Sequence, residues 1–408
     1  MPRTATDLSP SETIDALAPE RIAANFPRTE VPGTGRTAFQ ITSGPDFCQA
    51  LYYFIPSMSA DGHWLVYQRY QVVEDVIQEV SWEALDMLTG ERRQLASVAT
   101  TPDFLTPGEP TVFNAAREEF IYSTGSAYRA VAIDTGDDRL LFEIPSDRAI
   151  KCQNCVSPCG RYFFYISQDA AQIERIKDGR SARREISDTQ LVRYDLDTGE
   201  HHLVVRINAF TKHVIPYGDR HLVFSYDHLP TEHMLLMTDY EGGWYAALRT
   251  PNQPGVQTCH YGATRRGVQY EASGGGQAYG GMTCPRTHRR VEFTVPNMPG
   301  RHVAAVPAGD RWMTDGVAEG GRVLYTLSEL SDGAEPSWQL LSGPWPTYGT
   351  GQKSHGHPYV TPCGRWVLLL AGDPATQTNH LYLMDVSDVP PTRGLPDYAA
   401  DAEMPFPV

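Results

Sequence analysis

The stretch Val156-Ser-Pro-Cys-Gly160-Arg-Tyr-Phe-Phe-Tyr165 returns near the end of the chain as Tyr359-Val-Thr-Pro-Cys-Gly364-Arg-Trp-Val-Leu-Leu-Leu370. Each copy combines a short strand, a tight turn at a glycine, and a strongly apolar or aromatic strand. Looser copies recur roughly 40–60 residues apart, a spacing typical of a repeat fold. Their turns lie at Gly62, Arg117, Gly218, Gly267 and Gly309.

Seven repeats, each long enough for about four strands, predict an all-β protein with a seven-bladed β-propeller fold. A pair of β-sandwiches would have no reason to repeat one phrase seven times. We expect residues 1–35, which are polar and rich in Pro and Thr, to form a loosely structured N-terminal arm. The propeller should then span residues 36–390, and residues 391–408 should form a C-terminal tail.

The overall charge limits the partners that this protein can have. The 408 residues carry a formal net charge of −15, although 41% of them are hydrophobic. An acidic surface argues against nucleic acid and against anionic membranes, because both attract basic surfaces. The first residues lack the apolar segment of a secretory signal, and no run reaches membrane-spanning length. We therefore expect a cytoplasmic protein with no membrane or nucleic-acid partner.

The chain has seven cysteines, an odd count for a secreted disulfide scaffold of this size. The spacing Cys152-x₂-Cys155-x₃-Cys159 could suggest a cluster or a zinc site, but no second CxxC follows at the spacing of a zinc ribbon. Cys159 and Cys363 occupy the same place in the two matching phrases. We interpret them as turn residues of the repeat.

A candidate metal site precedes the last repeat, where Gln352, His355 and His357 lie within six residues. Two neutral imidazoles and an amide oxygen suit a borderline divalent cation such as Mn²⁺, Fe²⁺, Ni²⁺ or Zn²⁺. Residues two apart in a strand face the same side, so both rings could reach one ion. A lone histidine at a strand start is more often a hydrogen-bonded structural residue, but the pair with a glutamine favours metal binding.

The register of the repeat adds further histidines to this site. The innermost strands of a propeller line its central channel, so equal positions in different blades should meet. Stepping back seven residues from Gly364, Gly309 and Gly267 gives His357, His302 and His260. With His302, the set has four ligands and leaves positions open for substrate, as in a catalytic metal site. In the other repeats the same step gives Gln153 and Ile55, and His213 lies slightly closer to its turn at Gly218.

With these residues identified, the chain resembles the oligogalacturonate lyase family of β-propeller polysaccharide lyases. Gln352-x-x-His355-x-His357-Pro358 resembles the metal-binding blade of that family, and the segment 300–316 resembles the part that supplies the remaining histidine ligand. Thr258-Cys-His260 resembles the phrase that contains the proposed base. The resemblance covers about residues 210–385, because Lys212-His213 and the segment 224–230 resemble the preceding blade.

The resemblance implies a metal-dependent lyase that cleaves acidic oligosaccharides containing uronate by β-elimination and leaves a 4,5-unsaturated uronate. His302, Gln352, His355 and His357 would bind the ion, most simply Mn²⁺, which would stabilise charge that develops beside the carboxylate. His260 would remove the C5 proton as a neutral imidazole. Positive and polar side chains must also bind the substrate, and the candidates are His213, Lys212 and Arg69, with Lys353 and Lys151 as further possibilities.

The sequence departs from the family in two places. Tyr261 stands where the family has an acidic residue after the base, and the segment 234–239 has no arginine where the family would place one. Another uronate-containing oligosaccharide therefore stays open as the substrate. A non-catalytic propeller scaffold and a metal-dependent sugar-acid hydrolase or lactonase are the alternatives, because the fold alone does not fix the function.

Overall fold

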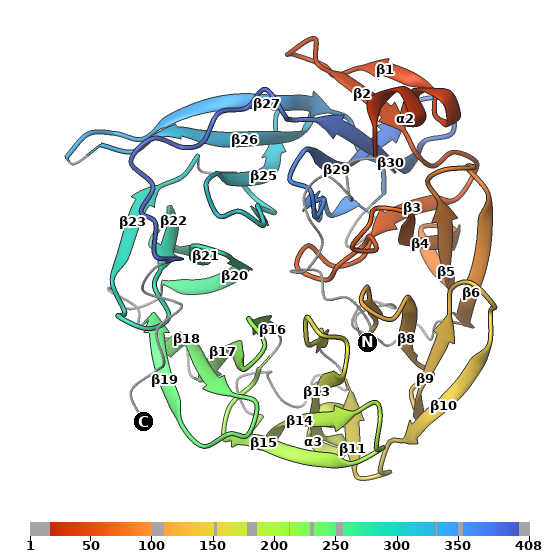
Figure 1. The fold of residues 1–408 in the computed structure, drawn as a ribbon, viewed down its shortest axis with the longest axis vertical. Helices are drawn as coiled ribbons and strands as arrows, with labels where there is room; N and C mark the ends of the chain where they lie inside the picture. The colour runs from red at the N-terminus through yellow and green to blue at the C-terminus, as the bar shows by residue number, and fades with distance from the viewer. Residues whose placement is uncertain are drawn as a thin grey trace. The chain divides into compact units, whose positions relative to one another are not determined.

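The computed structural model describes residues 17–99, 110–150, 153–177, 186–211, 213–228, 232–249, 256–296, 298–331, 333–349 and 354–399. Over these residues the strands pair into seven antiparallel sheets of four or five strands, which confirms the prediction of a seven-bladed β-propeller (Figure 1). The helices in the described part of the chain are short. They are α2 (Pro19–Asn25) and α3 (Ala170–Lys177).

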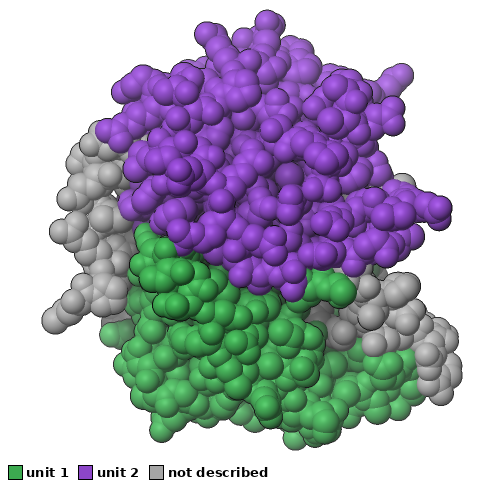
Figure 2. Space-filling model, turned by 90° about the vertical axis from the view of Figure 1, so that its right-hand side faces the viewer, with its two compact units in different colours: residues 1–7, 98–259 green, residues 8–97, 260–408 purple. Residues whose placement is uncertain are grey.

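The chain divides into two compact units, one of residues 1–7 and 98–259 and the other of residues 8–97 and 260–408 (Figure 2). We call them unit 1 and unit 2. No helix among the described residues combines the length and apolar character needed to cross a membrane.

Unit 1 contains three of the sheets, each built from strands that follow one another in the sequence. Helix α3 follows the third strand of one sheet, and Ile173 of the helix is buried in the core of this unit. The first sheet has β7 (Val112–Asn114), β8 (Glu119–Ser123), β9 (Ala127–Ala132) and β10 (Asp138–Glu143). The second has β11 (Arg148–Ile150), β12 (Cys155–Val156), β13 (Tyr162–Asp169), β14 (Thr189–Asp195) and β15 (His201–Ile207). The third has β16 (Val214–Tyr217), β17 (His221–His228), β18 (Glu232–Asp239) and β19 (Tyr245–Arg249).

The remaining four sheets belong to unit 2, although two strands, β6 and β20, extend slightly past its boundaries. One sheet has β3 (Phe47–Ala50), β4 (Trp64–Val73), β5 (Val76–Asp86) and β6 (Arg92–Ala99). The next has β20 (Gln257–Thr264), β21 (Gly267–Gly274), β22 (Gln277–Thr283) and β23 (Arg290–Thr294). A third has β24 (Val303–Ala305), β25 (Trp312–Ala318), β26 (Gly321–Glu329) and β27 (Ser337–Trp345).

The last sheet joins the two ends of the chain. Strands β28 (Tyr359–Val360), β29 (Trp366–Asp373) and β30 (Thr378–Asp385) pair in order, and β30 then pairs with β2 (Thr37–Gln40), which pairs with β1 (Arg28–Glu30). In Figure 1 the red N-terminal strands lie against the blue C-terminal strand. Strands β29 and β30 are buried along almost their whole length, because the sheet packs on both of its faces.

The expectation of a loosely structured arm is wrong for residues 17–35. Leu17, Ile22 and Phe26 are buried in a core cluster of unit 2, and Trp366 Nε1 donates a hydrogen bond to the carbonyl of Leu17 at 3.0 Å. Ile22 and Phe26 lie four apart, so α2 and its C-cap present them on one side. Apolar spacing therefore outweighs the polar composition here.

Residues 391–399, which belong to the expected tail, also pack on unit 2. Leu395 and Tyr398 are buried in a core cluster, and the N–H of Thr392 donates to the carbonyl of Asp310 at 2.9 Å. The proposed domain limits at residues 36 and 390 therefore exclude parts of the chain that belong to the folded core.

Candidate metal centre

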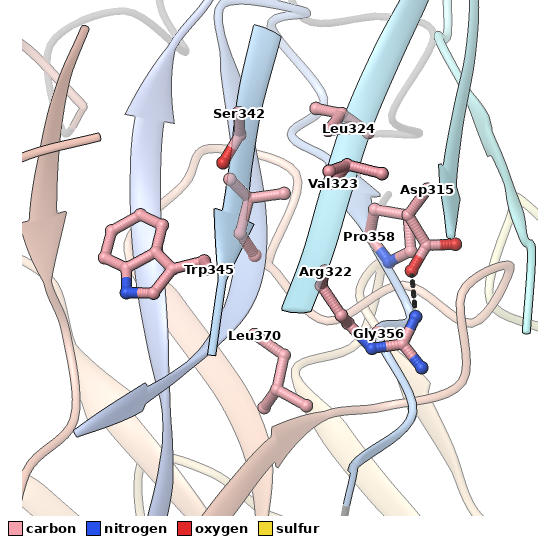
Figure 3. A pocket seen from close by; sticks show the side chains of 10 residues that line it. Asp315, Arg322, Val323, Leu324, Ser342, Trp345, Gly356, Pro358 and Leu370 are labelled. Carbon is pink, nitrogen blue, oxygen red and sulfur yellow. Dashed lines mark hydrogen bonds and ion pairs between the residues drawn. The ribbon is translucent and has the colours of Figure 1, made fainter. Parts of the chain in front are cut away.

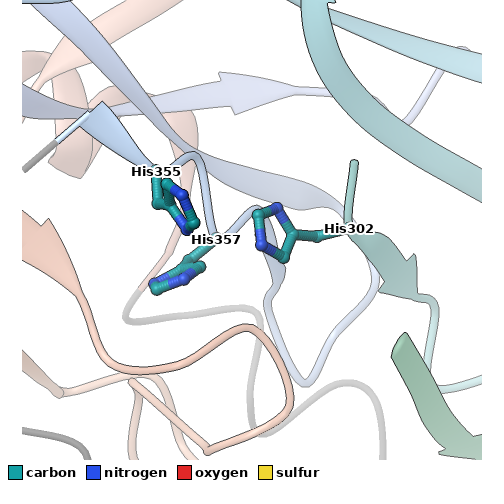
Figure 4. Close-up of side chains that lie close together, drawn as sticks. All are labelled: His302, His355 and His357. Carbon is teal, nitrogen blue, oxygen red and sulfur yellow. The ribbon is translucent and has the colours of Figure 1, made fainter. Parts of the chain in front are cut away.

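Three of the predicted ligands lie together in unit 2. His302, His355 and His357 each offer a ring nitrogen, and these nitrogens lie within 4.8 Å of one another (Figure 4). His302 directly precedes β24, and His357 lies two residues before β28. His302 and His357 are buried, and His355 is partly exposed. Small side-chain rotations would bring three such nitrogens to the distance of about 2 Å that imidazole ligands keep from a divalent ion.

Asp315 fixes the orientation of His302. These residues lie opposite each other on the hairpin of β24 and β25, one step beyond the pair Val303 and Thr314. Asp315 Oδ1 accepts the backbone N–H of His302 at 2.7 Å and lies 3.2 Å from its Nδ1. A proton on Nδ1 satisfies this contact and leaves Nε2 of His302 available to a metal ion, as in sites where a carboxylate lies behind a ligating histidine.

The other oxygen of Asp315 forms an ion pair with Arg322 at 2.8 Å, and both side chains are buried (Figure 3). Arg322 also donates from Nε to the carbonyl of Ser354 at 2.7 Å and from Nη1 to that of Gly300 at 3.2 Å. One guanidinium thus connects the segment before His302 with the segment before His355. Breaking a buried pair of this kind typically costs about 3–5 kcal/mol, because it leaves an uncompensated charge.

A second contact fixes His355. Gln49 Nε2 in β3 donates to the carbonyl of His355 at 2.8 Å, and Gln49 Oε1 accepts from the hydroxyl of Tyr70 in β4 at 2.8 Å. The backbone of residues 354–357 is therefore held from two sheets.

Gly356, between His355 and His357, allows the segment to approach Asp315 and Arg322 closely. A Cβ at this position would overlap Asp315 Oδ2 and lie 2.9 Å from Arg322 Nη1. The next residue, His357, has a φ of 49°, in the left-handed region that histidine seldom adopts. Such backbone conformations cost about 1–3 kcal/mol and concentrate at functional sites.

The environment of His357 fits a metal ligand. Neither of its buried ring nitrogens has a hydrogen-bond partner among the described residues. The residue opposite it on the hairpin is Leu370, counting from the pair Tyr359 and Leu368, so no carboxylate faces it there. The ring of Tyr52 packs edge-on against His357 with centroids 4.5 Å apart. An imidazole that is buried without partners is costly, and an ion would satisfy it.

The pKa values of the three histidines are lowered, which favours the neutral imidazole. Burial lowers the pKa of His302 and of His357 well below the usual value. The neighbouring histidines and Arg322 lower both pKa values further. Burial also lowers the pKa of His355, together with Arg322, against an opposing effect of Asp315. Burial raises the pKa of Asp315, while Arg322 and the N–H of His302 oppose the rise. Neutral imidazoles are the form that binds metal.

His260 lies beside this cluster. Its ring centroid is 4.5 Å from that of His302, and Tyr53 packs against both rings at 5.1 and 5.5 Å. The hydroxyl of Tyr53 accepts the N–H of Tyr261 at 3.0 Å, which ties this aromatic ring to β20. His260 Nδ1 is 3.6 Å from Oε2 of Glu271 in β21. The three histidines of one predicted register thus meet in unit 2.

The structure gives positions for two of the other predicted site residues, Arg69 and His213. Gln352, Lys212, Lys353 and Lys151 lie outside the described residues. Arg69 is engaged by Glu83 at 3.0 Å and Asp46 at 3.4 Å. His213 is buried in unit 1 directly before β16. Their roles stay predictions.

The sequence reasoning missed several residues that position the histidines. Gln49, Tyr52, Tyr53 and Arg322 come from other sheets or from distant strands, and no local pattern marks them. Glu271 could have been found, since it lies opposite His260 when residues are counted outward from the turn Arg265-Arg266.

No protein-family model matches the chain, and no curated protein matches it. Solved structures do match. An oligogalacturonate lyase from Vibrio parahaemolyticus superimposes with a TM-score of 0.69 over 89% of this chain and 97% of that one, at 17% identity. An oligogalacturonate lyase in complex with manganese gives 0.70 over 88% and 96%, also at 17% identity.

A puromycin hydrolase also matches, with a TM-score of 0.55 and 13% identity over 85% of this chain. The match covers 52% of the hydrolase, so this chain corresponds to about half of that protein. At such identities the comparisons establish a shared β-propeller fold with enzymes of more than one kind.

Proposed function

We propose that the protein is a metal-dependent lyase that cleaves uronate-containing oligosaccharides by β-elimination. The observation that carries the proposal is the group of three histidines beside a fourth histidine that faces a carboxylate. One of the three, His357, has two buried ring nitrogens that find no hydrogen-bond partner in the described part of the chain. The fold similarity to two oligogalacturonate lyases over almost their whole length supports the same class of reaction.

His302, His355 and His357 would hold the ion, and Gln352 is the proposed fourth ligand. Their donor set suits Mn²⁺ among other borderline cations. A bound divalent cation would act as a Lewis acid toward the uronate carboxylate and lower the energy of charge that develops next to it. Asp315, Arg322 and Gln49 keep the ligands in place, so little reorganisation is needed when the ion binds.

The proton transfer is assigned to His260. Its unprotonated Nε2 accepts the proton from C5 of the uronate, the C5–H electron pair becomes the C4–C5 double bond, and the bond from C4 to the glycosidic oxygen breaks. The departing oxygen takes a proton from solvent. A positioned base of this kind typically contributes about 10²–10⁴-fold in rate.

The test is to incubate the purified protein with a panel of uronate-containing oligosaccharides, with Mn²⁺ and with a chelator. Near-ultraviolet absorbance of an unsaturated uronate reports elimination. We expect metal-dependent absorbance on one substrate class. A protein that binds no divalent ion and yields no absorbance would contradict the lyase and favour a non-catalytic scaffold. Product without a double bond would favour a hydrolase.

Two variants test the base. His260→Ala should keep Mn²⁺ binding and lose about 10²–10⁴-fold of the elimination rate. His63→Ala is the matched control, since His63 is a partly exposed histidine paired with Asp86 at a repeat turn. Full activity of His260→Ala would refute the assignment of the base without touching the metal centre.

A further inference from the structure

We propose that Glu271 is the positioning residue of His260: it holds the imidazole with its proton on Nδ1 and so keeps Nε2 free to accept the substrate proton. This inference rests on the proposed function for its catalytic meaning. Its structural content, the tautomer and orientation of one histidine, can be measured without substrate.

Two adjacent hairpins of unit 2 share one arrangement, a histidine opposite a carboxylate. In the hairpin of β24 and β25, His302 faces the carboxylate Asp315. In the hairpin of β20 and β21, the residue opposite His260 across the turn Arg265-Arg266 is again a carboxylate, Glu271. Side chains at such opposed positions lie about 4.5–5.5 Å apart at Cβ, close enough for direct interaction.

Glu271 is buried beside His260. Its exposed fraction is 3%, and a buried carboxylate must find partners. Oε1 accepts a short hydrogen bond from the hydroxyl of Thr314. Oε2 lies 3.6 Å from His260 Nδ1, slightly beyond a hydrogen bond, and such contacts often tighten when substrate binds. An Nδ1–H of His260 is the donor that this oxygen requires.

The contact with Glu271 also sets the direction of the His260 ring. Because Nδ1 faces Glu271, Nε2 is on the opposite edge of the imidazole. The side chain of His260 is 19% exposed, against 3% for that of Glu271, so the ring reaches toward solvent while the carboxylate stays behind it. A carboxylate that fixes the tautomer of a base in this way can be worth about 10⁴-fold in kcat in serine proteases.

Thr314 links the two carboxylates. It donates to Glu271 and precedes Asp315, whose carboxylate holds His302. The side chain of Glu271 is thereby anchored to the strand that also orients a metal ligand. Glu271 also offsets the departure seen in the sequence, since it supplies a carboxylate near His260 although Tyr261 follows the histidine.

The experiment uses the full-length protein labelled with ¹⁵N-histidine. In the metal-free protein we expect the resonances of His260, assigned by their loss in His260→Gln, to show the Nδ1–H tautomer. Glu271→Gln keeps the size of the side chain but no longer requires a donor at Nδ1, so the Nε2–H tautomer should gain population. An unchanged tautomer in Glu271→Gln would overturn the inference.

The Mn²⁺-loaded enzyme gives the second readout. Glu271→Gln should lower kcat by about 10²–10⁴-fold with little change in KM, because orientation of the base acts on the chemical step. Mn²⁺ affinity should stay unchanged. The double variant His260→Gln/Glu271→Gln should be no slower than His260→Gln alone. Additive losses would mean that Glu271 acts independently of His260 and would overturn the inference.

Two further variants complete the design. Glu292→Gln is the matched control in the same sheet, where Glu292 pairs with Arg290 at 3.6 Å, and should leave tautomer and kcat unchanged. Thr314→Val removes the anchor of Oε1 and should give a smaller shift in the same direction, which keeps the test valid if Glu271→Gln fails to fold. If Glu271→Gln changes the tautomer but the unmodified protein eliminates no substrate, the proposed function fails and the positioning role stands.

Discussion

The turn 157–162 in unit 1 and the turn 361–366 in unit 2 are nearly the same structure with different surroundings. In both, a hydroxyl accepts the N–H of the aromatic residue at the turn end and lies 3.3 Å from the cysteine sulfur. In both, the arginine after the glycine donates two hydrogen bonds, from Nε and Nη2, to the aspartate at the end of a strand. The pairs are Arg161 with Asp195 at 2.6 and 3.0 Å, and Arg365 with Asp385 at 2.8 and 3.1 Å.

The difference lies in the residues that precede each turn. In unit 1 both ends of the Asn154 side-chain amide make hydrogen bonds within the fold. Nδ2 donates to the hydroxyl of Tyr128 at 2.6 Å, and Oδ1 accepts from the N–H of Ile166 at 3.1 Å. In unit 2 the corresponding segment carries His355 and His357, and the ring of His357 has no hydrogen-bond partner among the described residues. The repeated turn therefore builds the scaffold in both units, and the residues before it determine where chemistry can occur.

Exchange of the residue seven positions before the turn glycine should have the largest effect. His357→Ala should weaken Mn²⁺ binding by more than about 100-fold, beyond what loss of a supporting contact around a metal costs. Gln153→Ala, at the same position in unit 1, should leave Mn²⁺ affinity unchanged. Calorimetric titration measures both. Equal affinities in the two variants would mean that the position has no special role in unit 2.

Replacing the two turn glycines by alanine should lower the stability of the protein by different amounts. Gly160 and Gly364 have φ values of 75° and 71°, so alanine costs about 1–2 kcal/mol at either position. A Cβ at Gly160 would also lie 2.8 Å from Asn114 Oδ1 and 2.9 Å from Ala116 Cβ, whereas at Gly364 it meets only the end of Arg311 at 3.5 Å. Overpacking adds about 1–3 kcal/mol, so Gly160→Ala should be the less stable variant.

Urea denaturation followed by tryptophan fluorescence and circular dichroism measures this difference. Gly275→Ala serves as a control, because its φ is 58° and, apart from its chain neighbours, no atom of the described residues lies within 4 Å of the added Cβ. The loss of unfolding free energy in Gly275→Ala should match that in Gly364→Ala. If Gly160→Ala is no less stable than the other two variants, Asn114 and Ala116 must move away from the added Cβ without loss of stability.

The smallest expected effect concerns the ion pairs of the turns. The hydrogen bonds from Arg161 lower the pKa of Asp195. Burial of Asp385 alone would raise its pKa, but hydrogen bonds from Arg365 and Ser387 outweigh it, so its pKa is also lowered. A carboxyl with a lowered folded-state pKa stabilises the fold above its unfolded value, near 3.9, and loses that contribution as the pH falls through the folded value.

Arg161→Met and Arg365→Met should therefore lower the urea midpoint slightly at pH 7, and the difference from the unmodified protein should shrink below about pH 4. Both arginines are partly exposed, so salt should reduce the difference as well. A midpoint difference that persists unchanged at pH 3 would show that packing of the arginine stems, not the charge pair, stabilises the turns.

Much of the fold and part of the candidate site follow from local patterns. The repeated phrase carries its own turn, hydrogen bonds and strand register, so the seven sheets and the alignment of His260, His302 and His357 could be predicted by counting. The pairing of His260 with Glu271 has the same origin, because a two-residue turn fixes which residues of a hairpin face each other.

The sequence alone determined the repeat, its register and the residue types that can bind a metal, because these depend on contacts within one hairpin. Only the tertiary structure decided that α2 packs on the core and that Tyr52 packs against His357. It also decided that Arg322 and Gln49 hold the backbone of residues 354–357. Those contacts join different sheets of unit 2, and they depend on how side chains pack between sheets rather than on the spacing of residues within one.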